Sequence, residues 1–150
     1  MPSSPLAVSG IALATALSPA AGLAGTDPVQ GWDLLRAIQT EEVETADDWF
    51  VTKIFPPQMR DGIAEFDLSG YAVPVTDGGQ AREFILVSDL GFCPFCGDPS
   101  HGTALTVMLD DPIDTLEEGQ RVTVRGALEP VRDPGTLMSA ILRKGRILVD

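Results

Sequence analysis

The chain has 150 residues, a length that suits one domain with its own hydrophobic core and is short for two. Hydrophobic residues make up 44% of it, and 15 glycines and 12 prolines favour a β-rich domain with many turns over a helical bundle. The formal net charge of −12 disfavours nucleic acid or an anionic membrane surface as a partner, because binding to either requires clustered Lys and Arg.

The N-terminal segment has most features of a secretory signal. No Asp, Glu, Lys or Arg precedes Asp27, and an apolar, Ala-rich run from Leu6 to Leu17 leads to the small residues Gly22 and Ala24, as at a cleavage site. The signal pattern lacks its usual Lys or Arg before the run, and the alternative is a small-residue tail. We predict a signal peptide over residues 1–24 and a periplasmic or secreted protein. The run is too short and interrupted for a membrane span, so none is expected after cleavage.

The next segment predicts one short helix followed by a polar linker. From Pro28 to about Thr40, apolar residues recur at helical spacing. These are Trp32, Leu35 and Ile38. The acidic run over residues 41–48 is interpreted as a solvated linker. We expect residues 25–60, which also include a strand near residues 48–55, to pack on a barrel formed by residues 61–150.

The remainder of the chain consists of strand signals. They cover residues 65–75, 82–88, 103–109, 121–128 and about 138–149. The apolar phase shifts between Leu68 and Tyr71, which predicts a β-bulge at Gly70, and Gly126 is a second candidate bulge. Asp77-Gly78-Gly79 is typical of a hairpin turn. The pattern predicts an all-β fold with one short N-terminal helix, a small, partly open Greek-key barrel of the OB-like type, with a β-sandwich as the alternative.

The densest cluster of reactive side chains lies in GFCPFCGDPSH. It contains both cysteines, Cys93 and Cys96, and the single histidine, His101. Two thiolates and an imidazole suit Zn²⁺ or Cu(I), and Asp98 could supply a fourth ligand. A structural zinc site would ordinarily show a second pair of ligands at this spacing, and the chain has none. The metal interpretation therefore rests on this loop alone.

Two other interpretations of the cysteine pair remain open. In a redox protein, Cys93 would attack and Cys96 would resolve, but such a pair normally starts a helix, and Pro99 with its neighbouring glycines predicts a loop. Alternatively, a disulfide would close this small loop and fix its local geometry, which an oxidising compartment permits. Outside this pair no catalytic residue is assigned, because no nucleophile elbow or glycine-rich phosphate loop occurs.

The remaining polar and aromatic candidates have simpler interpretations. Three adjacent carboxylate pairs are interpreted as solvated turn residues. These are Asp47-Asp48, Asp110-Asp111 and Glu117-Glu118. Trp32 and Trp49 are interpreted as core or edge packing, with a shared exposed patch as the alternative.

An ordered set of motifs resembles a family of small exported bacterial proteins classed as a domain of unknown function. The motifs are W-D-L-L from Trp32, F-P-P-Q-M from Phe55, L-S-G-Y-A-V-P-V from Leu68, E-F-I-L-V-S from Glu83, C-P-F-C-G from Cys93 and V-T-V-R-G-A-L from Val122. The resemblance implies export, an OB-like barrel and a cysteine-bearing loop, and it carries over residues 93–97 but not His101. The resemblance implies no activity. From the cysteine loop we predict a metal-binding module, with a thiol–disulfide redox protein and a domain with a structural disulfide as the alternatives. Its expected partner is a transition-metal ion, Zn or Cu, or an exported protein.

Overall fold

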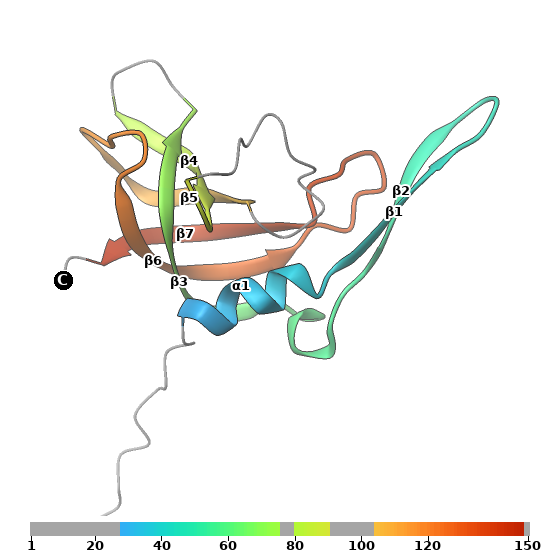
Figure 1. Ribbon diagram of the computed structural model, residues 1–150, viewed down its shortest axis with the longest axis horizontal. Coiled ribbons are helices and arrows are strands. Elements are labelled where there is room, and N and C mark those ends of the chain that lie inside the picture. Colours follow the sequence, from blue (N-terminus) through green and yellow to red (C-terminus); the bar gives the residue numbers. More distant parts are fainter. Residues whose placement is uncertain (1–27, 76–79, 91–103, 149–150) are drawn as a thin grey trace, which may run out of the picture.

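The structure, a computed structural model, describes residues 28–75, 80–90 and 104–148. One helix, seven strands and a short 3-10 turn follow one another along these residues (Figure 1). They are α1 (Pro28–Arg36), β1 (Gln39–Glu44), β2 (Trp49–Ile54), η1 (Pro57–Met59), β3 (Ile63–Pro74), β4 (Ala81–Val87), β5 (Ala104–Ile113), β6 (Arg121–Pro130) and β7 (Ala140–Leu148). The predicted signal and the predicted hairpin turn at residues 77–79 lie outside the described residues.

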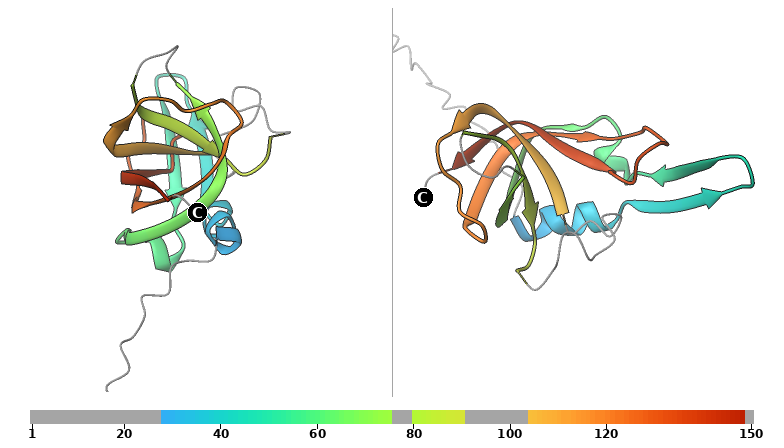
Figure 2. Two further views of the ribbon diagram at one scale, coloured as in Figure 1. Left: turned by 90° about the vertical axis from the view of Figure 1, so that its left-hand side faces the viewer. Right: turned by 90° about the horizontal axis from the view of Figure 1, so that it is seen from above.

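Five strands form a closed barrel in the order β3-β4-β5-β7-β6, and β3 closes it by pairing with both β4 and β6. The pair β5–β7 is parallel, and the other pairs of the barrel are antiparallel. This is the Greek-key order of an OB-type barrel. The predicted mostly-β fold with one short helix is thus confirmed. The barrel is closed rather than partly open (Figures 1 and 2).

The predicted bulge at Gly70 is wrong. Buried residues alternate along β3 without a change of phase, from Phe66 through Gly70 to Ala72, and the pairing with β6 is regular from Phe66 to Tyr71. The register irregularity lies earlier, between Ile63 and Phe66. Glycine is needed at position 70 for another reason, which is close packing. A Cβ there would lie 2.5 Å from the main-chain oxygen of Val87.

The second candidate bulge, at Gly126, is confirmed as a register irregularity between β6 and β7. Arg125 pairs with Arg146 and Ala127 with Arg143, so two β7 residues fall opposite Gly126 alone. The extra residue therefore belongs to β7, where Lys144 has a φ of 52°. A Cβ on Gly126 would lie 2.6 Å from the oxygen of Arg143, so the bulged strand approaches β6 too closely for a side chain.

Helix α1 ends at Arg36, a turn before the predicted end near Thr40. Its apolar residues are buried as the helical spacing predicts, and they join the barrel core. They are Trp32, Leu35 and, just past the helix, Ile38. Gly31 allows the helix to lie close against β3, because a Cβ there would lie 2.7 Å from Cδ1 of Leu68. The helix consequently runs along the outside of the barrel (Figure 2).

The first half of the acidic run, residues 41–44, lies in a strand rather than in the linker that we predicted, and residues 45–48 connect β1 to β2. β1 pairs with β2 from Gln39–Ile54 to Glu44–Trp49, and this two-stranded ribbon projects from the barrel (Figure 1). Main-chain pairing with β2 accounts for the strand, and solvent exposure of its carboxylates removes the cost of their charge. We call residues 39–54 the arm.

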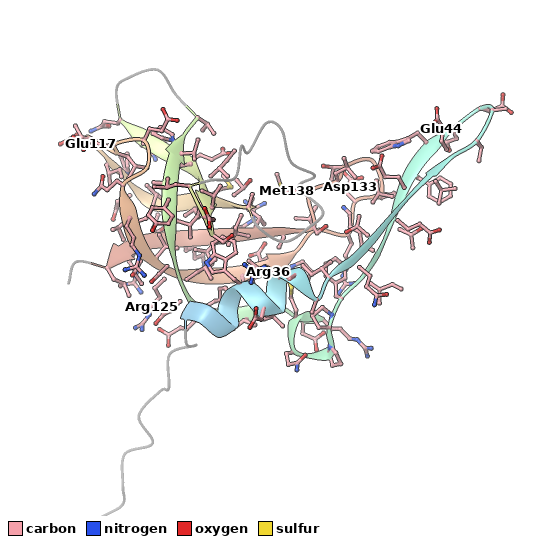
Figure 3. The ribbon with its side chains drawn as sticks, in the orientation of Figure 1. Arg36, Glu44, Glu117, Arg125, Asp133 and Met138 are labelled. Atoms are coloured by element: carbon pink, nitrogen blue, oxygen red, sulfur yellow. The ribbon has the colours of Figure 1, made fainter. Side chains whose placement is uncertain are left out.

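The arm is attached to the loop between β6 and β7. The amide of Val51 donates to the oxygen of Pro134 at 2.8 Å. The Lys53 ammonium donates to three main-chain oxygens of this loop, those of Val131, Asp133 and Met138, at 3.2, 2.9 and 2.7 Å. Burial lowers the pKa of Lys53, while the Asp133 carboxylate opposes that effect. Figure 3 shows Asp133 and Met138 at the foot of the arm.

Candidate functional site

The four predicted ligands, Cys93, Asp98, Cys96 and His101, lie outside the described residues. The two ends of their loop are described, because β4 ends at Val87 and β5 begins at Ala104. These two residues are direct partners in the antiparallel pair β4–β5. Residues 88–103 therefore connect neighbouring strands, and both ends of the cysteine loop leave the barrel at one place.

The rest of the described chain offers no second metal site and no membrane helix. Among residues 28–75, 80–90 and 104–148, no group of three or more His, Asp or Glu side chains is arranged to hold a metal ion. The described helices likewise include none long and apolar enough to cross a membrane.

A pocket of about 230 Å³ lies where the cysteine loop begins. Its walls come from α1, the middle of β3, the start of β6 and the residue after β4. The lining residues are Trp32, Arg36, Ser69, Gly70, Tyr71, Ser88 and Arg121. Ser88 directly follows Val87, so the pocket and the cysteine loop share this end of β4.

Local geometry brings the pocket residues together in two pairs. Trp32 and Arg36 are one turn apart on α1 and so lie on the same side of the helix (Figure 3, where Arg36 is labelled). On the barrel, Tyr71 of β3 is the direct cross-strand partner of Arg121 of β6. Directly opposed residues of an antiparallel pair project from the same face of the sheet. The helix and the two strands thus each supply one pair of lining residues.

The floor of the pocket is held by Trp32. This side chain is 6% exposed, and its indole Nε1 donates a 2.7 Å hydrogen bond to the main-chain oxygen of Ser69. The indole lies over Gly70, where a Cβ would be 3.1 Å from Cζ2 of Trp32. The Ser69 and Thr123 hydroxyl groups form a 2.6 Å hydrogen bond with each other. The floor is therefore fixed by specific contacts.

Two guanidinium groups line this pocket in an acidic protein. Arg36 makes one contact, from Nη1 to Oδ1 of Asp33 at 3.0 Å, and both side chains of that pair are exposed. Arg121 is exposed and forms no ion pair within the described part of the chain. The pocket accordingly has one guanidinium, that of Arg121, without an ion-pair partner among the described residues, and a second, that of Arg36, paired with Asp33.

No motif in the sequence predicted this pocket. Trp32 was correctly interpreted as a packing residue, and Trp49, 39% exposed, stands apart from it on the arm. The expected alternative of a shared tryptophan patch is therefore wrong. Arg121 had no signal beyond its place at the start of a strand, since its partner Tyr71 is fifty residues away in the sequence.

A separate ion pair lies next to the pocket on β3 and β6. Arg125 contacts Asp67 through Nε to Oδ1 and through Nη2 to Oδ2, each at 2.6 Å. The hydrogen bonds from Arg125 lower the pKa of Asp67, against the opposing effect of burial, and the same bonds raise the pKa of Arg125. Because both partners are satisfied by each other, this pair is a structural clamp between two strands.

The adjacent carboxylate pairs are solvated as we predicted, but Asp110 and Asp111 lie within β5 rather than in a turn. All six side chains are exposed. They are Asp47, Asp48, Asp110, Asp111, Glu117 and Glu118. None of them lines the pocket, so none is a candidate for its chemistry.

Comparisons with known proteins give one similarity. The chain matches no model of a known protein family and no curated protein sequence. It is similar to a solved structure of a DUF3299 family protein from Pseudomonas aeruginosa PAO1, at 23% identity and a TM-score of 0.39. The match covers 60% of this chain and spans 64% of the length of that one. This similarity carries no statement about the family or function of the chain, and export and the cysteine loop stay predictions.

Proposed function

We propose that this protein is an exported OB-type binding module that holds one soft transition-metal ion, Zn²⁺ or Cu⁺, in its cysteine loop. Cys93 and Cys96 would supply two thiolates, and His101 an imidazole. Asp98 or a water molecule would complete the site. The thiolates provide affinity, because soft ligands select these metals over the harder Mg²⁺ and Ca²⁺.

The pairing of Val87 with Ala104 carries the proposal on the structural side. Because these residues are partners, the chain that contains all four ligands must leave and return at the same end of β4 and β5. A chain rises at most about 3.6 Å per residue, so Cys96 stays within about 11 Å of Cys93 and within about 18 Å of His101. Side chains so constrained can converge on one ion at a small entropic cost.

The alternatives use the same two cysteines. A thiol–disulfide protein would have Cys93 as the attacking thiolate and Cys96 as the resolving thiol. A structural or interaction domain would keep them as a disulfide. The three possibilities differ in what the purified protein contains, namely a bound ion, a reversible disulfide or a permanent one.

Native mass spectrometry of the protein, purified from the periplasm without reductant or chelator, tests the proposal. We expect one bound metal ion per chain that is lost on acidification, because protons displace the metal from thiolate and imidazole. Cys93→Ser combined with Cys96→Ser should abolish the bound mass and leave the barrel folded. The control variant, Asp110→Asn with Asp111→Asn, changes an exposed carboxylate pair outside the loop and should retain the metal.

A metal-free species about two hydrogens lighter than the dithiol would overturn the metal proposal. A reduction potential well above that of structural disulfides would then favour the redox alternative, and a lower one the structural disulfide. Metal that persists at full stoichiometry in the double cysteine variant would also contradict the assignment to this loop.

Export has its own measurement. N-terminal sequencing of the protein from a periplasmic fraction should give a mature chain that begins at Gly25, after cleavage behind Ala24. Recovery of the intact chain from the cytosolic fraction alone would contradict the signal prediction, and with it the oxidising compartment on which the disulfide alternative depends.

A further inference from the structure

We propose that the pocket between α1, β3 and β6 binds a small organic carboxylate. This inference does not depend on the metal proposal, because it is argued from described residues alone and uses none of the predicted metal ligands. It rests on three features of the pocket that have no role in the proposed metal site. They are the guanidinium of Arg121, which forms no ion pair within the described residues, the second guanidinium of Arg36 and the indole of Trp32.

The charge of the pocket points to an anion. The chain as a whole carries −12, and only ten of its residues are Lys or Arg, yet two of them face this one cavity. Arg36 gives one N–H to Asp33, which leaves its other guanidinium donors. Within the described residues, Arg121 forms no ion pair that would use any of its guanidinium N–H donors. An anion binding against the overall field of the protein needs such local positive charge.

The shape of the guanidinium groups narrows the class of anion. A planar fork of N–H donors matches the two oxygens of a carboxylate, as it also matches phosphate. The floor of Trp32 offers an apolar surface, which suits a ligand with a carbon body rather than an inorganic ion. At about 230 Å³ the cavity is smaller than the roughly 300–1,000 Å³ of pockets for drug-sized ligands, so the ligand is small.

Two hydroxyl groups complete the polar part of the lining. The Ser69 hydroxyl is not one of these two, because it already forms a hydrogen bond with the Thr123 hydroxyl. The side chains of Tyr71 and Ser88 line the cavity and can donate to a second carboxylate oxygen or accept from a ligand donor. Tyr71 is the direct cross-strand partner of Arg121, so the two side chains project from the same face of the sheet. We assign the carboxylate to this Tyr71–Arg121 end and the carbon body to Trp32.

The two tryptophans make a direct test possible. In the full-length protein labelled with ¹⁵N, the indole N–H signals of Trp32 and Trp49 are followed by NMR during a titration with benzoate at constant ionic strength. Removal of one signal in Trp49→Phe assigns the pair. We expect the Trp32 signal to shift to saturation at millimolar benzoate, while the Trp49 signal on the arm stays in place.

Matched probes separate charge from shape. Benzamide has nearly the shape of benzoate without its charge and should bind at least tenfold more weakly. Inorganic phosphate has the charge without the carbon body and should also bind at least tenfold more weakly. Benzamide or phosphate binding as tightly as benzoate would overturn the assignment to an organic carboxylate.

Matched variants locate the charge. Arg121→Gln should weaken benzoate binding at least tenfold, and Arg36→Gln should weaken it by a smaller factor, because Asp33 already shares that guanidinium. Arg82→Gln is the control, since Arg82 is exposed on β4, outside the pocket, and likewise forms no ion pair within the described residues. Absence of a saturable Trp32 shift, or equal binding by Arg121→Gln and Arg82→Gln, would overturn the proposal.

Discussion

The indole Nε1 of Trp32 donates a 2.7 Å hydrogen bond to the main-chain oxygen of Ser69, which ties α1 to the middle of β3. Trp32→Phe removes this donor and part of a 6% exposed ring. The carbonyl loses a partner and a cavity opens, so we expect the free energy of unfolding to fall by about 1–3 kcal/mol. Urea denaturation followed by circular dichroism measures it.

Trp49→Phe is the matched control. The indole of Trp49 also donates, to Oε2 of Glu42, but on the exposed arm. Its loss should change the free energy of unfolding by no more than about 0.5 kcal/mol. Equal costs for the two substitutions would mean that the Trp32 contact does not hold the helix on the barrel.

Gly70 is packed so closely that any side chain must displace main chain. A Cβ at this position would lie 2.5 Å from the oxygen of Val87 and 2.9 Å from Cγ of Leu86. Since Tyr71 pairs with Val87, that main chain is held by the sheet. We expect Gly70→Ala to lower the thermal midpoint and to cost about 1–3 kcal/mol or more.

For comparison, Gly135→Ala in the exposed β6–β7 loop brings a Cβ to 3.2 Å from a single carboxylate oxygen of Asp133, at the end of a movable side chain. A calorimetric scan should show a much smaller decrease for Gly135→Ala than for Gly70→Ala. Similar decreases would contradict the close approach of β3 to β4.

The Asp67–Arg125 pair predicts a pH dependence of stability. Because hydrogen bonds from Arg125 hold the pKa of Asp67 below its unfolded value of about 3.9, the folded state binds fewer protons there. The contribution is therefore present above that pH and is lost as the pH falls through the lower folded value. Asp67→Asn should cost about 1 kcal/mol at pH 6, and the difference from the unmodified protein should shrink towards pH 2.

Denaturant titrations at several pH values measure this difference. Glu129→Gln serves as the control, because Glu129 meets Arg143 in an ion pair whose side chains are 50% and 47% exposed. Solvent screening should keep its effect near zero at every pH. A cost for Asp67→Asn that is the same at pH 6 and pH 2 would exclude the ion pair as its cause.

Lys53 is expected to hold the arm against the barrel. Lys53→Met leaves the three carbonyl oxygens of the β6–β7 loop without their shared donor. Local opening of the arm then becomes easier, and amide exchange in β1 and β2, including that of Val51, should accelerate about tenfold. Amides of β3 and β6 should keep their protection, as hydrogen-exchange NMR can check.

The corresponding control is Thr52→Val, next to Lys53 on the exposed side of β2. It removes no contact with the β6–β7 loop, and its effect on exchange should be small. Acceleration throughout the barrel in Lys53→Met would show that the arm and the barrel open as one unit, contrary to this prediction.

Much of the fold could be predicted from local pattern. The strand signals predicted strands that the structure contains, and the helical spacing of Trp32, Leu35 and Ile38 predicted residues that are buried. β1 was missed because its acidic residues have no buried face of their own, and only pairing with β2 makes them a strand. The bulge at Gly70 was wrongly predicted because Tyr71 is apolar enough to mimic a change of phase while it lies half outside the core.

By itself, the sequence determined the class of fold and the candidate cysteine loop, because both depend on residues near one another along the chain. The pocket was decided by the tertiary structure alone. Arg121 meets Tyr71 only through the pairing of β3 with β6, and Trp32 reaches them only because Gly31 and Gly70 let α1 approach the barrel closely. Composition and spacing do not encode such convergence, since it depends on which distant strands pair and in which register.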